Sequence, residues 1–283
     1  YFGQDKIGNT GQFRKYLNAL STTVPGAIVV FGVSEFTTVD QSLYNYDLTL
    51  QVEKYGNETF SMLSQKYPDA YQYGYRFEFY ADYFESHPEV EYAIFSDVDM
   101  LILKNPFELM SKNPEEVHFM YDYKPFYRKS DNNYLWATAW NSLNNDVKRS
   151  CGIEVLNKSL DDNSILPLIP WNSGLMMGKA KNLLTFCRFF SKAFFCPGMF
   201  KNNAEQGLMN HLYLTGQIFT LGIKFHGHHV IDGAFMSCPH SLNVNAFRNR
   251  INTHQVYGIH HYQLLKSGYV SACYPELIKF INY

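Results

Sequence analysis

Short apolar runs alternate along this chain with stretches whose apolar residues repeat at the spacing of a helix. The runs are rich in β-branched and aromatic residues and predict buried strands at residues 27–33, 46–52, 92–96, 117–121, 171–178, 218–225 and 256–260. The helical spacing predicts helices at residues 75–86, 106–110, 180–195, 204–214 and 275–281. Strands that alternate with helices are typical of an α/β fold.

The clearest predicted helix covers residues 75–86. Apolar side chains recur within it one turn apart, at Phe77, Tyr80, Ala81 and Phe84. It ends before Pro88, because a residue that precedes proline avoids the α region. Residues 122–165 are different: they are polar, have little periodicity and predict long loops. No repeat or linker interrupts the chain, so we expect one domain over residues 1–283.

Composition excludes two broad classes of protein. The 283 residues include 24 Lys+Arg and 26 Asp+Glu, so the net charge is −2 and no basic block is present to contact nucleic-acid phosphates. The longest apolar run near the start, residues 27–33, is far shorter than the ~20 residues of a membrane-spanning helix. Aromatic residues make up 17% of the chain, which favours a thick core and surfaces for stacking. We therefore expect neither a nucleic-acid partner nor a membrane span.

The cellular compartment is indicated only by weak signals. The chain starts without an initiating Met or an apolar signal core, so we expect a targeting segment to have been trimmed off. Two N-x-S/T sequons, at Asn57 and Asn157, favour a lumenal location, in the ER or Golgi, over a cytoplasmic one. The five cysteines are scattered without a C-x-x-C pair, and an odd number cannot all pair within one chain.

The strongest chemical signal is a pair of acids directly after a predicted strand. Asp97 and Asp99 follow the apolar residues 92–96 and precede a second apolar run. In extended backbone residues i and i+2 share a face, so both carboxylates can point into one cleft at the edge of the sheet. Two adjacent acids repel unless a cation lies between them, and carboxylate oxygens suit Mg²⁺ or Mn²⁺. The alternative is a solvated turn, in which Asp is common.

Four sequence blocks, in order, resemble the GT-A-type glycosyltransferases, which use nucleotide sugars. The segment YAIFSDVDMLILKNPFELM resembles their D-x-D core, and WNSGLMMGKAKNLLTFCRFF resembles the strand that lines the sugar pocket. NNAEQGLMNHLYLTG resembles the following D-Q-x-x-x-N helix, with Glu205 where Asp is usual, and VYGIHHYQLLK resembles a late metal and phosphate segment. The blocks cover about residues 75–266. The resemblance implies a Rossmann-like single domain with a mostly parallel central sheet flanked by helices.

The resemblance also implies a metal site. Asp99 would bind Mn²⁺ or Mg²⁺ directly, and Asp97 would reach the metal or the nucleotide ribose. His260 would complete the site, with His261 as the alternative because side chains alternate along a strand. The nucleotide would bind to about residues 1–121.

Two basic residues would contact the diphosphate of the donor. Lys266 would match the family's phosphate-contacting lysine, although Gln263 replaces a Gly and no Pro-Trp follows. Arg76 occupies a position that is basic in many such enzymes, and its alternative is an exposed helical Arg that covers apolar surface.

The remaining implied residues would handle the sugars, in a part that spans about residues 122–283. Asn172 and Ser173 would hydrogen-bond the donor sugar, with Gly174 leaving room for its ring. Glu205 and Gln206 would be catalytic, although Glu205 could instead only cap its helix. Aromatic residues that could stack on sugars are Tyr121, Tyr123, Phe126, Tyr127, Tyr134, Trp136, Trp140 and Trp171.

The function expected from these features is metal-dependent transfer of a sugar from a nucleoside diphosphate sugar, by family habit UDP-linked, to a glycan or glycoprotein hydroxyl. One alternative is a catalytically silent GT-A-like protein that binds carbohydrate through its aromatic residues. A second alternative is a zinc hydrolase, in which His226, His228 and His229 would hold zinc with Asp232 nearby.

Overall fold

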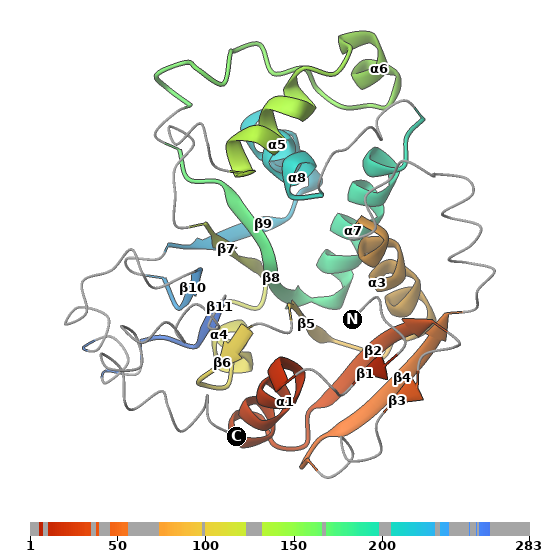
Figure 1. The fold of residues 1–283 in the computed structure, drawn as a ribbon, viewed down its shortest axis with the longest axis vertical. Coiled ribbons are helices and arrows are strands. Elements are labelled where there is room, and N and C mark those ends of the chain that lie inside the picture. Colours follow the sequence, from red (N-terminus) through yellow and green to blue (C-terminus); the bar gives the residue numbers. More distant parts are fainter. Residues whose placement is uncertain are drawn as a thin grey trace. The chain divides into compact units, whose positions relative to one another are not determined.

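A computed structural model describes residues 6–7, 11–34, 38–39, 46–55, 74–97, 100–122, 132–165, 168–197, 205–229, 233–237, 249, 253 and 255–260. The chain divides into two compact units. The first comprises Tyr1–Phe60, Ser96–Leu109 and His228–Tyr283, and the second comprises Ser61–Phe95 and Met110–Gly227. Helices and strands are mixed in both, which confirms the predicted α/β class (Figure 1). No helix in these described ranges is long and apolar enough to cross a membrane.

The first unit is built mainly from short paired strands. Its elements are β1 (Lys6–Ile7), α1 (Gly11–Thr23), β2 (Ile28–Ser34), β3 (Thr38–Val39), β4 (Thr49–Tyr55), β6 (Met100–Ile102), β10 (Phe235–Ser237) and β11 (Gly258–His260). Strands β2 and β4 are parallel, as are β1 and β3. Strand β11 runs parallel to β10 and antiparallel to β6. The predicted strands at 27–33, 46–52 and 256–260 are confirmed with shifted bounds, whereas α1 and β10 were not predicted.

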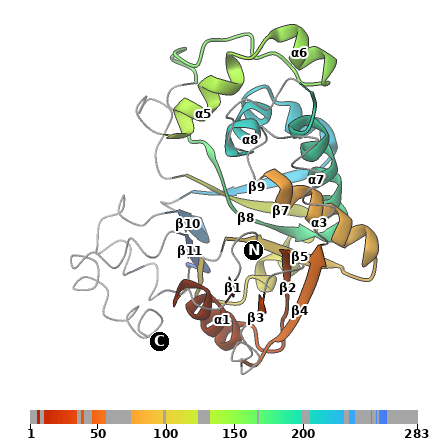
Figure 2. The ribbon, with the colours of Figure 1, turned by 45° about the vertical axis from the view of Figure 1, so that its right-hand side comes forward.

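The second unit contains a four-stranded sheet and most of the helices. Its elements are α3 (Tyr75–Ser86), β5 (Tyr92–Ser96), β7 (Glu116–Tyr121), α5 (Asn132–Asn141), α6 (Asn145–Ser150), β8 (Trp171–Lys179), α7 (Ala180–Phe194), α8 (Glu205–Leu214), the 3-10 helix η3 (Gln217–Leu221) and β9 (Lys224–His228). The division falls within α4 (Phe107–Lys112) and before the last residue of β5 and of β9. The strand order is β5-β8-β7-β9, with β7 and β8 antiparallel. Helix α3 lies along α7 and α5 along α8 (Figures 1 and 2).

Aromatic side chains fill the contact between α3 and α7. Phe77 of α3 lies against Phe186 and Phe190 of α7, with ring centroids 6.0 and 4.2 Å apart. All three side chains are buried. Buried rings of this size contribute about 1.5–3 kcal/mol each through apolar burial. Much of the high aromatic content therefore serves the core of the second unit.

Two predictions from the sequence pattern were wrong. Residues 122–165 were expected to be loops, yet they contain α5 and α6. Helix α6 begins where Asn144 Oδ1 accepts from the backbone N–H of Asp146 at 2.7 Å, a capping contact that the composition concealed. The strand expected at 218–225 is mostly η3, because Gly216 and Gly222, with φ of 80° and 68°, interrupt extended backbone on both sides.

Gly207 explains how α5 packs against α8. A Cβ at this position would lie 2.5 Å from Trp140 Cδ1 and 2.9 Å from the carbonyl oxygen of Trp136. No side chain fits in that space. The glycine therefore lets the two helices approach more closely than alanine would.

Candidate functional site

Five of the residues singled out by sequence lie in one polar cluster of the second unit. Arg76 is the second residue of α3, Ser173 the third of β8 and Glu205 the first of α8. Arg76 Nη2 donates to the carbonyl oxygen of Ser173 and to Glu205 Oε1, both at 3.2 Å. The guanidinium group thus ties together three elements that are far apart in the sequence.

Ser173 links the acid Glu205 and the neighbouring amide Gln206 of α8. Its hydroxyl donates to Glu205 Oε1 at 3.2 Å and to Gln206 Oε1 at 3.0 Å. Its backbone N–H also donates to Gln206 Oε1, at 3.1 Å. One residue earlier, Asn172 Oδ1 accepts from the backbone N–H of Gly174 at 2.8 Å. These bonds hold the start of β8 in one position relative to the first turn of α8.

The cluster is nearly closed to solvent. Arg76, Glu205 and Gln206 are only 8%, 7% and 7% exposed. Burial of charged groups is costly unless they are paired, and here the guanidinium meets the carboxylate in an ion pair of 3.2 Å. The exposed helical position considered for Arg76 is therefore wrong, and Glu205 does more than cap its helix.

Asn210 fixes the strand beneath this cluster. Its Oδ1 accepts from the backbone N–H of Trp171 at 2.7 Å, and its Nδ2 donates to the carbonyl oxygens of Trp171 and Gln206 at 3.1 and 2.8 Å. Trp171 itself is fully buried and stacks on Phe119 at a centroid distance of 3.5 Å. A sugar-stacking role for Trp171 is therefore wrong.

The other aromatic residues considered for stacking divide into three groups. Tyr123, Phe126 and Tyr127 lie outside the described residues. Trp140 is buried against Phe194. The half-buried ones, which retain some exposed surface, are Tyr121, Tyr134 and Trp136.

Asp122 joins the cluster and was missed by the sequence reasoning. It is 7% exposed, and its Oδ2 accepts from Asn172 Nδ2 at 3.4 Å. Its backbone N–H donates to the carbonyl oxygen of Pro170 at 2.8 Å. Asp122 directly follows the predicted strand 117–121, just as Asp97 directly follows the predicted strand 92–96. A search for an acid after every predicted strand would therefore have found Asp122.

The first unit brings the D-x-D segment to the late histidine. His260 Nε2 lies 3.5 Å from Asp97 Oδ2. The reason is the strand register: His260 is paired with Met100 across β11 and β6, and Met100 N–H donates to the carbonyl oxygen of Asp97 in a turn. The histidine is 2% exposed, whereas the Asp97 side chain is 38% exposed and accessible to a ligand. Asp99, His261 and Lys266 lie outside the described residues.

Tyr16 of α1 lies at the same strand end. Its hydroxyl shares a hydrogen bond of 2.7 Å with Ser96 Oγ, the residue before Asp97. Burial raises the pKa of Tyr16, the bond to Ser96 opposes this, and the charge of Asp97 raises the pKa further. The phenol is therefore neutral at physiological pH and anchors the backbone that leads into the acidic pair.

The donor atoms fit a divalent cation. A carboxylate oxygen and an imidazole nitrogen are both common ligands of Mn²⁺, and the acid is accessible beside a buried imidazole. Asp99 is two residues from Asp97 in the sequence, so a second carboxylate belongs to the same segment.

A separate group of histidines lies on the sheet. His118 of β7 lies beside His226 of β9, with ring centroids 5.3 Å apart, and Glu116 Oε2 is 3.6 Å from His226 Nδ1. Imidazole nitrogens are metal ligands, so His118 and His226 could hold a metal ion. His228 follows two residues later on the same strand. The pKa of His118 is lowered to about 4, mainly by burial and in smaller part by the neighbouring His226, while the charge of Glu116 opposes the shift. The sequence indicated His226 and His228 but missed His118, and Asp232 lies outside the described residues.

Similarity to known proteins is found among solved structures. No family model matches the sequence, and no curated protein matches it. The solved structure of mouse xyloside xylosyltransferase 1, in its apo form, is similar in fold, with a TM-score of 0.45 and 14% sequence identity. The match covers 92% of this chain and 96% of that chain.

Proposed function

We propose that this chain is a metal-dependent glycosyltransferase. It transfers a sugar from a nucleoside diphosphate sugar, UDP-linked, to a hydroxyl group of a glycan or glycoprotein. The observation that carries the proposal is the 3.5 Å approach of His260 to Asp97, the first acid of the D-x-D segment. The resemblance of the sequence implies His260 as a metal ligand and Asp97 as a contact of either the metal or the nucleotide ribose.

The proposed metal ligands are Asp97, Asp99 and His260, and the ion is Mn²⁺ or Mg²⁺. When bound, the ion supplies positive charge to the diphosphate as the sugar–phosphate bond breaks. The protein has a net charge of only −2 and no basic block, so it needs such a countercharge for an anionic donor. Lys266 is proposed as an additional phosphate contact.

The polar cluster of the second unit is proposed to bind the donor sugar. Asn172 and Ser173 carry the polar groups, and Gly174 presents backbone without a side chain. Asp122 orients Asn172 through the 3.4 Å contact. A network of fixed donors and acceptors discriminates strongly between sugars, because a sugar that lacks one hydroxyl leaves a buried polar group unpaired.

Glu205 and Gln206 are the proposed catalytic residues. Arg76 holds the carboxylate of Glu205 through the 3.2 Å ion pair and so acts as a positioning residue. A contact of Arg76 with the diphosphate stays a prediction. Glu205→Gln keeps the shape of the side chain and removes its charge. A fall in kcat with unchanged KM for the acceptor would identify Glu205 as the base toward the acceptor hydroxyl. A rise in KM for the donor would assign it to sugar binding.

The deciding experiment measures release of nucleoside diphosphate from a panel of nucleotide sugars. With Mn²⁺ present, we expect at least one donor to be consumed, and chelation of the metal to abolish this. Asp97→Asn should lower the rate about 100-fold or more, since one electrostatic contact to the transition state is worth this much. Asp146→Asn is the matched control, because Asp146 is 90% exposed on α6 and pairs only at the surface with Arg149.

Two results would contradict the proposal. If no donor is consumed and Mn²⁺ does not improve binding of the nucleotide, the chain is a carbohydrate-binding protein without transferase activity. If the purified protein instead holds zinc that is lost in His228→Ala, the histidine group on the sheet is the functional metal site.

A further inference from the structure

The loop that follows α6 carries one of the two sequons in an exposed position. Asn157, Lys158 and Ser159 are all exposed to solvent. The residues that flank them are anchored: Ile153 and Leu160 are buried, at 2% and 4% exposed. The loop is therefore fixed at both ends while the acceptor tripeptide faces outward.

Hydrogen bonds to η3 hold the first part of this loop. Gln217 Oε1 accepts from the backbone N–H of Glu154 at 3.0 Å, and Gln217 Nε2 donates to the carbonyl oxygen of Gly152 at 2.5 Å. After the sequon, Ser159 Oγ accepts from the backbone N–H of Asp161 at 3.2 Å. None of these three bonds uses the Asn157 side chain, so a substituent on it leaves them intact.

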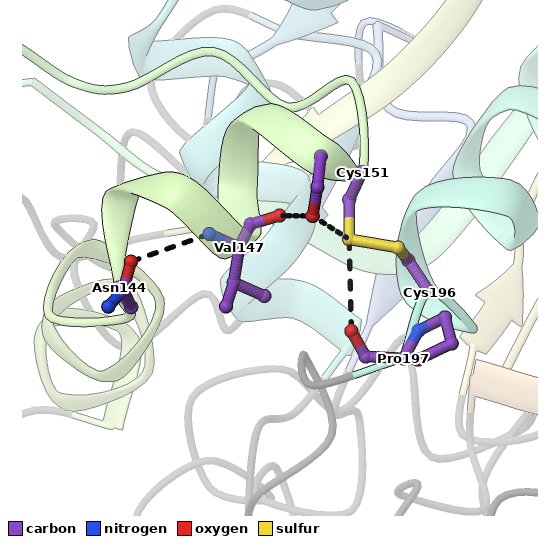
Figure 3. The surroundings of a disulfide bond; sticks show 6 residues. Asn144, Val147, Cys151, Cys196 and Pro197 are labelled. Atoms are coloured by element: carbon purple, nitrogen blue, oxygen red, sulfur yellow. Dashed lines mark hydrogen bonds between the residues drawn. A yellow bond between two sulfur atoms is a disulfide. The ribbon is translucent and has the colours of Figure 1, made fainter.

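A disulfide at the start of the same loop is an independent indication of the compartment. Cys151 is bonded to Cys196, which joins the end of α6 to the segment after α7 (Figure 3). Disulfides form and persist mainly in oxidising compartments, where sequons are also modified. The sequon can be seen in the sequence, whereas the disulfide is seen only in the structure and indicates the oxidising compartment in which sequons are glycosylated.

The surface beside Asn157 has room for a bulky group. Asn157 lines an open cleft of about 430 Å³, together with Arg149, Gly152, Ile153, Glu154 and Val155. A first sugar attached at this position meets open space and polar groups.

We propose that Asn157 carries an N-linked glycan. The oligosaccharide comes from a donor of the lipid diphosphate class. The bond between the sugar C1 and the diphosphate oxygen breaks, and a bond forms between C1 and Asn157 Nδ2. The amide loses one proton, and the lipid diphosphate leaves with the bonding electron pair. No oxidant or reductant takes part.

The test uses the full chain secreted from eukaryotic cells behind a cleavable signal peptide. Asn57→Gln is present throughout, so that only Asn157 can be modified. We expect peptide N-glycosidase to reduce the apparent mass of this protein and to convert Asn157 to aspartate labelled by heavy-oxygen water. Asn157→Gln should abolish the mass change.

A matched pair at the third position separates the sequon from the fold of the loop. Ser159→Thr keeps a hydroxyl that can accept from Asp161 N–H and should keep the glycan, whereas Ser159→Ala should lose it. An unmodified Asn157 in secreted protein whose Cys151–Cys196 bond has formed would overturn the proposal. A glycan that persists at Asn157 in Ser159→Ala would overturn it as well.

Discussion

Arg76 and Glu205 are 129 residues apart in the sequence, and their side chains form a 3.2 Å ion pair that is about nine-tenths buried. The pair joins the first turn of α3 to the first residue of α8. Both charges have left water, so each depends on the other for compensation. The pair therefore couples the stability of the second unit to the geometry of its polar cluster.

Arg76→Met should destabilise the protein by about 3 kcal/mol, because it leaves the buried carboxylate of Glu205 without its cation. Arg76→Met combined with Glu205→Gln should recover at least about 1 kcal/mol, since the uncompensated charge is then gone. Urea unfolding followed by circular dichroism measures both free energies. Arg149→Met is the control: it removes a solvent-exposed pair with Asp146 and should cost less than about 0.5 kcal/mol. If Arg76→Met and Arg149→Met lose the same unfolding free energy, the buried ion pair stabilises the protein no more than the exposed one.

Asp122→Asn tests the contact that sequence reasoning missed. Asparagine cannot offer Asn172 Nδ2 a charged acceptor, and a hydrogen bond to a charged group is worth about 1.5–3 kcal/mol. If Asn172 binds the donor sugar as proposed, KM for the donor should rise about tenfold. The melting temperature should fall only modestly, because asparagine keeps the shape of the side chain and a neutral acceptor for the same bond. Asp161→Asn, at an exposed aspartate on the same unit, is the control. An unchanged donor KM would remove Asp122 from the site.

Local signals predicted much of the fold. The bounds of α3 and β5 agree with the predicted 75–86 and 92–96, because an apolar face and a following proline are encoded nearby. Helix α5 was missed because only its packing makes it a helix: Trp140 and Ala137 are buried, and Gly207 on α8 provides the space. That partner lies far along the chain and leaves no periodic signal in α5 itself.

For the site as well, the sequence indicated single residues but not the contacts between them. The end of a strand identified Asp97, since a polar residue after an apolar run is visible in any sequence, whereas the segment at Asn172 was identified by its resemblance to the glycosyltransferases. The partners could not be predicted, because the ion pair of Arg76 with Glu205 depends on how α3, β8 and α8 pack. The pairing of Cys151 with Cys196 was equally hidden, since five scattered cysteines allow many pairings.

Removal of the disulfide should weaken the second unit. The Cys151–Cys196 bond closes a loop with a sequence separation of 45, and a bond of this kind contributes about 2–4 kcal/mol, largely by restricting the unfolded chain. The double variant Cys151→Ser/Cys196→Ser should lose this amount in urea unfolding. Wild-type protein in dithiothreitol should lose at least this amount, and wild type and double variant should have the same stability when both are in dithiothreitol. Cys187 is a buried free thiol that is present in both proteins, so it does not contribute to the difference in stability between them. A wild-type protein indifferent to reductant would contradict the assignment.

Acid should destabilise the protein through His211. This residue of α8 is 1% exposed, and its Nε2 lies 2.9 Å from the carbonyl oxygen of Glu154. The pKa of His211 is lowered from 6.5 to about 4, mainly by burial and in smaller part by the charge of Lys148, while the hydrogen bond to Glu154 opposes the shift. Between these two pKa values the unfolded chain binds a proton that the folded chain does not, so stability falls as the pH falls from about 6.5 to about 4.

From the two pKa values, His211 should account for about 2 kcal/mol of lost unfolding free energy between pH 7 and pH 5. His211→Gln keeps a side-chain amide that can donate to Glu154 and does not titrate, so its stability should change by about 2 kcal/mol less over the same interval. His87→Gln, at a partly exposed histidine at the end of α3, is the matched control for the exchange of a histidine for glutamine. Urea unfolding at pH 5, 6 and 7 measures all three proteins. If His211→Gln keeps the full acid sensitivity of the wild type, the imidazole is not the group that titrates.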